Sequence, residues 1–235
     1  MKLFLTNPDV WYIFGETPTF IVRELEGIYN KVLENSKIFP DAKKNLAGVL
    51  DESYVIQHSD KFNEFITGTI NTNLEGINGN STVLKYSNFL DMETQRHWIN
   101  IQRKGNFNPI HTHSGQYSYV FWHKVPFHFE EENKVSILKD TSYNRDLGDF
   151  TFSFVDINEM FSLQNVMNNR QKNRSYLSTI KMGIDNKREN YFCIFPSWLP
   201  HSVDPFYSSD ENRVSFSGNY EQSSEFNVKE GKSLL

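Results

Sequence analysis

Two histidines separated by one residue are the first feature of this sequence that could do chemistry. They are His111 and His113, in the segment Asn108-Pro-Ile-His-Thr-His-Ser-Gly115. If this segment enters a β-strand, both imidazoles lie on one face, because strand side chains alternate with a period of two. They could then chelate one metal ion. A His-x-His pair alone is weak evidence, since surface loops and core histidines also produce such pairs.

A third imidazole is available from His201, which follows the apolar run Phe195-Pro-Ser-Trp-Leu-Pro200. A histidine directly after such a proline-bounded turn points into the mouth of a barrel. Three protein ligands leave coordination positions open, which a catalytic metal site needs and a structural one does not. We therefore predict that His111, His113 and His201 bind a metal ion and are the catalytic residues.

The segment Arg213-Val-Ser-Phe-Ser-Gly-Asn219 reads as a strand with one polar face, formed by Arg213, Ser215, Ser217 and Asn219. An arginine inside a small barrel is unfavourable without a partner, because a buried unpaired charge is costly. A guanidinium group pairs with a carboxylate through two parallel hydrogen bonds. The strand therefore predicts a clamp for an anionic ligand. The alternative is a surface strand whose polar face lies in water.

A series of short strands must position these residues. From about residue 81 the sequence alternates in the manner of a half-buried strand, as in His97-Trp-Ile-Asn-Ile-Gln102. Polar turns rich in Asn and Gly separate the apolar runs. Strands are expected at 97–102, 117–123, 135–138, 150–155, 176–180, 191–195 and 213–220. The polar segment Asn158–Arg174 is expected to be a loop or a short helix.

The first eighty or so residues have a different, helical pattern. Thr17-Pro18 can begin a helix, because proline is tolerated in the first turn. Apolar residues then recur at helical spacing in two groups: Leu25, Ile28, Tyr29, Val32 and Leu33, and Phe62, Phe65, Ile66, Thr69 and Ile70. We expect one domain over residues 1–235, mainly β with N-terminal helices (α+β). A helical portion (1–80) would pack on a β-barrel or sandwich core (81–222), followed by a C-terminal tail (223–235).

Composition excludes several classes of protein. The net charge is −5 and no run of Lys and Arg occurs, so no nucleic-acid partner is expected. No stretch approaches the roughly 20 apolar residues of a membrane span, and the start lacks the layout of a signal peptide. We expect a soluble cytoplasmic protein without a membrane partner. The single cysteine, Cys193, lies in an apolar run and is expected to be a buried, inert thiol.

Taken together, these motifs resemble the 2-oxoglutarate/Fe(II)-dependent oxygenases of marine phages and bacteria, whose wider relatives are prolyl-hydroxylase-like. The resemblance covers roughly 98–219. It rests on His111-Thr-His113, Tyr117-Ser-Tyr-Val-Phe-Trp122, Phe195-Pro-Ser-Trp-Leu-Pro-His201 and the Arg213–Asn219 strand. The piece Lys44-Asn-Leu-Ala-Gly48 is also similar to the N-terminal part of the phage proteins.

This resemblance implies a double-stranded β-helix, the jelly-roll or cupin-like barrel, with Fe(II) and 2-oxoglutarate as cofactors. It implies that His111 is the first ligand, that His201 is the distal one, and that Arg213 binds the far carboxylate of 2-oxoglutarate. Ser215 shares the face of Arg213 and is a second cofactor-binding candidate. Tyr119 and Trp122 are candidates for an aromatic contact with the cosubstrate, and strand parity leaves both open.

The sequence departs from the family pattern at His113, where relatives usually carry Asp or Glu. Asp204 is three residues after His201, so in an extended strand it faces the other side. Asp91 and Glu93 precede the motif by about twenty residues. His113 is therefore the predicted third ligand. Imidazole ligands also suit zinc, copper and nickel, so the identity of the metal depends on this residue.

The resemblance implies a hydroxylase that couples oxidative decarboxylation of 2-oxoglutarate to C–H oxidation. The substrate, a small molecule or a protein side chain, is not encoded in any readable motif. If the chain is phage-encoded, its place is the host cytoplasm. Two alternatives stay open: a cupin-type three-His dioxygenase that uses no 2-oxoglutarate, and a non-catalytic binding or virion-associated protein on the same scaffold.

Overall fold

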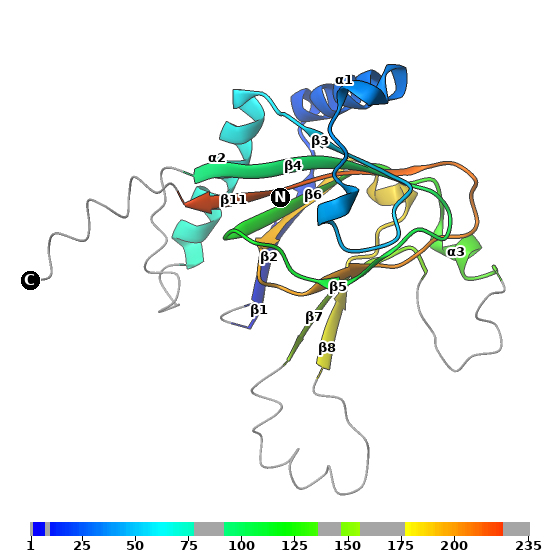
Figure 1. The fold of residues 1–235 in the computed structure, drawn as a ribbon. Helices are drawn as coiled ribbons and strands as arrows, with labels where there is room; N and C mark the ends of the chain where they lie inside the picture. The colour runs from blue at the N-terminus through cyan, green and yellow to red at the C-terminus, as the bar shows by residue number, and fades with distance from the viewer. Residues whose placement is uncertain (1, 8–9, 78–91, 136–146, 156–176, 223–235) are drawn as a thin grey trace, which may run out of the picture.

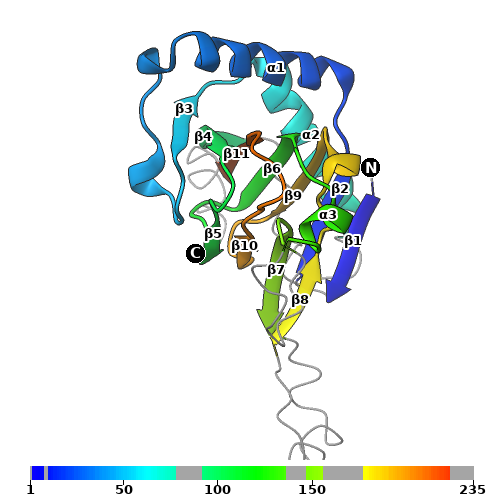
Figure 2. The ribbon, with the colours of Figure 1, turned by 90° about the vertical axis from the view of Figure 1, so that its right-hand side faces the viewer.

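Two antiparallel β-sheets pack against each other, and two long helices cover the outer face of the larger sheet (Figure 1, Figure 2). This computed structural model describes residues 2–7, 10–77, 92–135, 147–155 and 177–222. The larger sheet has the strand order β1 (Lys2–Asn7), β2 (Val10–Glu16), β9 (Tyr191–Pro196), β6 (Tyr117–Lys124), β11 (Arg213–Gln222), β4 (Met92–Gln102) and β3 (Glu52–Ile56). The smaller sheet has the order β5 (Asn108–His111), β10 (His201–Val203), β7 (Phe150–Val155) and β8 (Leu177–Lys181).

The helices are amphipathic and bury one stripe each. Helix α1 (Thr19–Glu34) begins directly after Pro18 and buries Ile21, Leu25 and Val32, and α2 (Asp60–Ile77) buries Phe62, Ile66 and Ile70. These side chains pack on every second residue of the central strands, including Ile99, Phe121 and Phe216. Each fully buried side chain of this size stabilises the fold by about 1.5–3 kcal/mol. Shorter elements of the described residues are α3 (Phe129–Glu132) and the 3₁₀ turns Ser36–Ile38, Lys43–Asn45 and Asn186–Arg188.

The opposite face of the larger sheet meets the smaller sheet and forms the interior of the jelly roll. Val120, Trp122 and Phe195 from the larger sheet pack with Phe150 and Phe152 of β7. Alternation along β11 then divides its residues between the two sides of the sheet. Val214 and Phe216 lie under the helices, so Arg213 and Ser215 face the interior of the jelly roll.

Most predicted elements are confirmed. Both helices form, and the strands expected at 97–102, 117–123, 150–155, 176–180, 191–195 and 213–220 correspond to β4, β6, β7, β8, β9 and β11. Cys193 is buried and free, and burial raises the pKa of its thiol well above the ordinary value. The expected strand 135–138 lies almost entirely outside the described residues, as do the segment 158–174 and the tail 223–235. Within the described part of the chain, no helix is long and apolar enough to cross a bilayer.

The N-terminal portion expected to be helical (1–80) also contains three strands that the sequence analysis did not predict. Strands β1 and β2 extend one edge of the larger sheet, and β3 forms its other edge. Residues 10–15 of β2 are all buried, so this strand lacks the alternation by which a half-buried strand is recognised. The N-terminal residues therefore complete the larger sheet in addition to covering it.

Candidate metal and cosubstrate site

The three predicted histidines come together at the end of the smaller sheet. His111 is the last residue of β5 and lies opposite His201, the first residue of β10. His113 lies beyond the end of β5, so the expectation that a strand places it beside His111 was wrong. Its backbone N–H instead donates to the Ser197 carbonyl at 2.9 Å, which holds it beside the turn that precedes His201.

The three rings lie close enough together to hold one metal ion. Ring centroids are 4.4 Å apart for His111 and His201, 4.9 Å for His111 and His113, and 5.0 Å for His113 and His201. One nitrogen from each residue lies within 4.8 Å of the others. An ion at the centre of such a group could contact all three after small side-chain adjustments.

Hydrogen bonds select the nitrogen that two of the rings present. His111 Nδ1 donates to the Pro109 carbonyl at 2.7 Å, and His201 Nδ1 donates to the Leu199 carbonyl at 3.0 Å. A carbonyl can only accept, so Nδ1 carries the hydrogen and Nε2 keeps the lone pair that binds a metal. The backbone here has the orienting role that outer-shell groups have in known metal sites.

The surroundings keep all three imidazoles neutral. Burial lowers the pKa of His111, lowers that of His113 to about 4 with a further contribution from His111, and lowers that of His201 well below its ordinary value. Phe150 stacks on His201 with centroids 5.3 Å apart, and Trp98 packs on His113 at 5.4 Å. Neutral imidazole is the form that metals bind.

No carboxylate of the described residues joins this group. Asp204, the nearest acidic residue after His201, uses its backbone carbonyl to accept hydrogen bonds from Arg213. Asp91 and the side chain of Glu93 lie outside what the structure describes. The donor set of three neutral nitrogens fits Fe(II) and other late first-row metals, so the residues present can hold the ion.

Arg213 is buried in the same pocket, with 2% of its surface exposed. Its Nε donates to Gln102 Oε1 at 2.9 Å, Nη1 donates to the carbonyls of Gly148 at 2.7 Å and Asp204 at 3.2 Å, and Nη2 also donates to Asp204. Of its five N–H groups, one on Nη2 remains without an acceptor among the described residues. The ring of Phe206 lies 5.2 Å from the guanidinium carbon.

Arg213 nevertheless keeps its charge. Burial lowers its pKa to about 10, while the carboxylates of Asp204, Glu132 and Asp149 act in the opposite direction. Two of these carboxylates are already bound to backbone N–H groups: Glu132 accepts from Tyr207 and Ser208, and Asp149 from Gly183 and Ile184. The pocket therefore offers a cation that an anionic ligand can reach.

The structure distinguishes between the two aromatic candidates. Trp122 packs in the interior cluster, with its ring 5.5 Å from that of Phe150. The Tyr119 side chain packs under the helices instead, and its hydroxyl lies 2.6 Å from His97 Nδ1. Tyr119 borders the pocket through its place in β6, but its hydroxyl is turned away. Trp122 is therefore the better candidate for a cosubstrate contact.

Several polar residues of the pocket did not figure in the sequence prediction. Asn100 and Gln102 face it from β4, and Asn108 faces it from β5. Asn100 and Gln102 alternate with Ile99 and Ile101 in the predicted strand, so their shared polar face was a usable signal. Asn108 gave none, because a register shift between β5 and β10 breaks the parity with His111. The pocket is lined by Leu46, Trp98, Asn100, Gln102, Asn108, His111, His113, Trp122, Phe150, Ile184, His201, Arg213, Ser215 and Ser217, among others.

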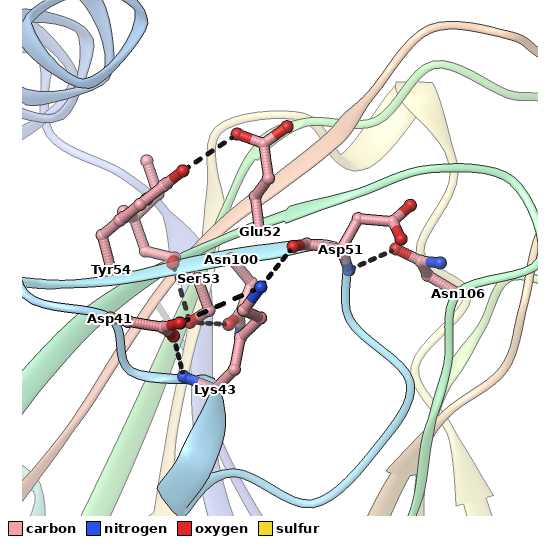
Figure 3. Close-up of polar contacts among 9 residues, drawn as sticks. Asp41, Lys43, Asp51, Glu52, Ser53, Tyr54, Asn100 and Asn106 are labelled. Atoms are coloured by element: carbon pink, nitrogen blue, oxygen red, sulfur yellow. Dashed lines mark hydrogen bonds and ion pairs between the residues drawn. The ribbon is translucent and has the colours of Figure 1, made fainter. Parts of the chain in front are cut away.

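The loop of residues 41–51 contributes Leu46 to the wall of this pocket. Figure 3 shows how the ends of the loop are held: Lys43 Nζ donates to the Asp51 carbonyl at 3.0 Å, and the Asp51 backbone N–H donates to Asn106 Oδ1 at 3.1 Å. Directly after the loop, the Ser53 hydroxyl donates to Asn100 Oδ1 at 2.8 Å. This bond leaves Nδ2 of Asn100 as a donor for a ligand.

Comparisons with known proteins show the family and the fold. Residues 96–219, more than half of the chain, match the model of the family described as "Putative 2OG-Fe(II) oxygenase". No curated protein matches the sequence. A prolyl-4-hydroxylase from Pseudomonas putida resembles the chain with a TM-score of 0.50 and 12% identity, over 91% of this chain and 93% of that one. The epimerase SnoN from nogalamycin biosynthesis, described as non-heme and alpha ketoglutarate dependent, gives 0.50 and 13%, over 90% and 78%. At these identities the likeness concerns the fold, a double-stranded β-helix.

Proposed function

Because the chain belongs to the 2OG-Fe(II) oxygenase family, we propose that His111, His113 and His201 hold its Fe(II) and that Arg213 binds the distal carboxylate of 2-oxoglutarate. The observation that carries this proposal is the convergence of three neutral imidazoles in a buried pocket that also contains a charged arginine. Ser215 and the Asn100 amide, which are register partners on neighbouring strands, are further donors for the cosubstrate. Trp122 forms part of the apolar wall.

The proposed reaction is hydroxylation of a C–H group, as in the prolyl-4-hydroxylase that shares this fold. Iron with 2-oxoglutarate and dioxygen supplies the oxidising chemistry, in which decarboxylation of the cosubstrate drives oxidation of the substrate. The chain's own residues position the reactants. Arg213 fixes the orientation of the cosubstrate through its carboxylate, and the aromatic walls formed by Phe150 and Trp98 exclude water. The substrate is a small molecule or a protein side chain.

A second candidate is a three-His dioxygenase that does not use 2-oxoglutarate. Two observations favour it: all three members of the cluster are histidines, and four hydrogen bonds to other groups of the protein engage Arg213. In this alternative Arg213 would be a structural residue. The two candidates differ in one measurable property, the binding of 2-oxoglutarate at the metal.

Anaerobic titration separates the two candidates. Fe(II) is added first to the metal-free protein, and 2-oxoglutarate follows while the visible spectrum is recorded. Chelation of iron by 2-oxoglutarate produces a metal-to-ligand charge-transfer band, which we expect here. Iron binding without the band would support the second candidate, and failure to bind any metal would exclude both. His201→Ala is the control, because it removes a ligand and should abolish the band.

A further inference from the structure

A chain of side-chain amides connects Arg213 to the loop of residues 41–51. Arg213 Nε donates to Gln102 Oε1 at 2.9 Å, Gln102 Nε2 donates to Asn108 Oδ1 at 3.0 Å, and Asn108 Nδ2 donates to the Ala47 carbonyl at 2.5 Å. All three side chains are buried. Hydrogen bonds in such a low-dielectric setting are stronger than in water and polarise one another.

The direction of this chain is fixed at its arginine end. A guanidinium group can only donate, so Gln102 must present its oxygen to Arg213 and its nitrogen to Asn108. Asn108 then accepts through Oδ1 and has only its nitrogen left for Ala47. Neither amide can flip without breaking two bonds. The orientation of Arg213 and the position of the loop are therefore linked through two side-chain amides, each of which has only one orientation that keeps its hydrogen bonds.

The backbone of the loop packs closely against Asn108 and its neighbour Phe107. Gly48 has a φ of +119°, and a Cβ at this position would lie 2.4 Å from the Phe107 carbonyl oxygen and 3.0 Å from Asn108 Nδ2. The next residue, Val49, exchanges two backbone hydrogen bonds with Phe107, at 2.9 and 3.2 Å. Glycine is thus required where the loop touches Asn108. This gives a physical role to the motif Lys44-Asn-Leu-Ala-Gly48.

We propose that Gln102 and Asn108 are positioning residues that couple the cosubstrate arginine to the wall carrying Leu46. A carboxylate that immobilises Arg213 also immobilises the two amides and seats the loop. By linkage, a seated loop keeps Arg213 ready to bind and lowers the entropic cost of binding. This inference rests on the proposed function, because it takes 2-oxoglutarate as the ligand of Arg213.

The first test measures coupling from the loop to the ligand site in Zn(II)-loaded protein, which binds without turning over. Two variants unseat the loop by different means: Gly48→Ala adds the clashing Cβ, and Asn108→Ser shortens the amide. Val49→Ala is the matched control, since this side chain is 55% exposed. We expect Gly48→Ala and Asn108→Ser each to speed hydrogen exchange over residues 43–49 and to raise the Kd for 2-oxoglutarate about fivefold or more. The control should change neither. Faster exchange with an unchanged Kd in both variants would overturn the coupling.

The second test needs no 2-oxoglutarate. Gln102→Met removes the side-chain amide that links Arg213 to Asn108. Gln102 contacts residue 47 only through Asn108, so any effect on the loop must pass along the hydrogen-bonded series. We expect exchange over 43–49 to accelerate in this variant while residues 52–56 of β3 keep their protection. Unchanged exchange over 43–49 would refute the relay even if the ligand binds. If instead wild-type protein fails to bind 2-oxoglutarate but this variant loosens the loop, the proposed function fails and the structural relay stands.

Discussion

His111 and His201 face each other in the register of the β5–β10 strand pair, with ring centroids 4.4 Å apart. Cross-strand partners project on the same face of a sheet, so the strand pairing itself places these two rings together. Each ring is also fixed by an Nδ1 hydrogen bond to a backbone carbonyl. His113 comes from the following loop and is held through its backbone. His111 and His201 are therefore the more firmly held pair of the three-histidine cluster, and the ring of His113 is the more adjustable member.

The first prediction concerns removal of a ligand. His201→Ala should reduce metal affinity by more than the roughly 10–100-fold that loss of an outer-shell partner costs, while the fold persists because the strands keep their backbone pairing. Metal content after equilibrium dialysis measures this loss, and circular dichroism checks the fold. His128→Gln is a suitable control, because His128 lies outside the three-histidine group. Equal metal content in both variants would show that His201 is not a ligand.

The second prediction concerns the identity of the metal. His113→Asp adds a negative charge to the three-histidine cluster and replaces a nitrogen donor by oxygen. Because harder oxygen ligands disfavour zinc and copper relative to imidazole, we expect the ratio of Fe(II) to Zn(II) affinity to rise. Competition between the two ions under anaerobic conditions gives this ratio. His113→Glu is a second variant in case the shorter Asp does not reach the ion. A ratio that is unchanged in both variants would mean that His113 does not contact the metal.

The third prediction concerns Arg213. Arg213→Lys keeps the positive charge but loses the planar guanidinium, including the one N–H of Nη2 that is left for a ligand, so 2-oxoglutarate binding should weaken by about tenfold, in keeping with the loss of one charge-assisted hydrogen bond. Metal affinity should stay unchanged. The unfolding free energy should also fall, because the carbonyls of Gly148 and Asp204 lose donors in a buried place. Calorimetric titration and urea unfolding measure the two effects. Arg103→Lys, at an exposed salt bridge with Glu52, should affect neither strongly.

Sequence reasoning singled out the three histidines and the arginine that the structure brings to one pocket, because these residue types stand in recognisable local motifs. It missed β1 and β2 because continuous apolar runs carry no strand period, and the assignment of β3 to a helical portion followed from its neighbours. Strand alternation does not account for the place of His113, because β5 ends at His111 and a backbone hydrogen bond to Ser197 holds His113 beside the other two histidines. Its role as third ligand stays a prediction. The Gln102–Asn108 connection could not be foreseen, because it depends on a register shift and on a loop some sixty residues earlier in the chain.

The fourth prediction concerns stability at low pH. His97 is buried under the helices beside His58, Glu24 and Tyr119, and its pKa is lowered to about 3, mainly by burial, with His58 contributing and Glu24 opposing. In the unfolded chain it titrates near 6.5, so the unfolded state takes up the proton first. The stability associated with neutral His97 is therefore complete above pH 6.5 and is lost as the pH falls toward 3, by up to about 1.4 kcal/mol per pH unit.

Urea unfolding at pH 7, 6 and 5 measures this dependence. His97→Gln keeps a hydrogen-bonding partner for the Tyr119 hydroxyl but cannot titrate. The slope of its unfolding free energy against pH should therefore be smaller than that of the wild type by about 1.4 kcal/mol per pH unit, the value for one proton. Glu24 has a pKa lowered to about 2, since hydrogen bonds from His58 and Ser59 outweigh its burial, and it stays ionised throughout. A pH dependence identical to that of the wild type would rule out the neutral buried state of His97.

The fifth prediction separates the two aromatic residues of β6. Tyr119→Phe removes a hydroxyl that lies under the helices and leaves Nδ1 of His97 without a partner, so it should lower the unfolding free energy by about 1–3 kcal/mol. It should leave the affinity for 2-oxoglutarate unchanged. Trp122→Leu should weaken 2-oxoglutarate binding, because it opens space in the interior wall beside Phe14 and Phe150. Parallel measurement of unfolding and of binding in both variants decides the assignment. A binding defect in Tyr119→Phe equal to that of Trp122→Leu would place the tyrosine in the cosubstrate site after all.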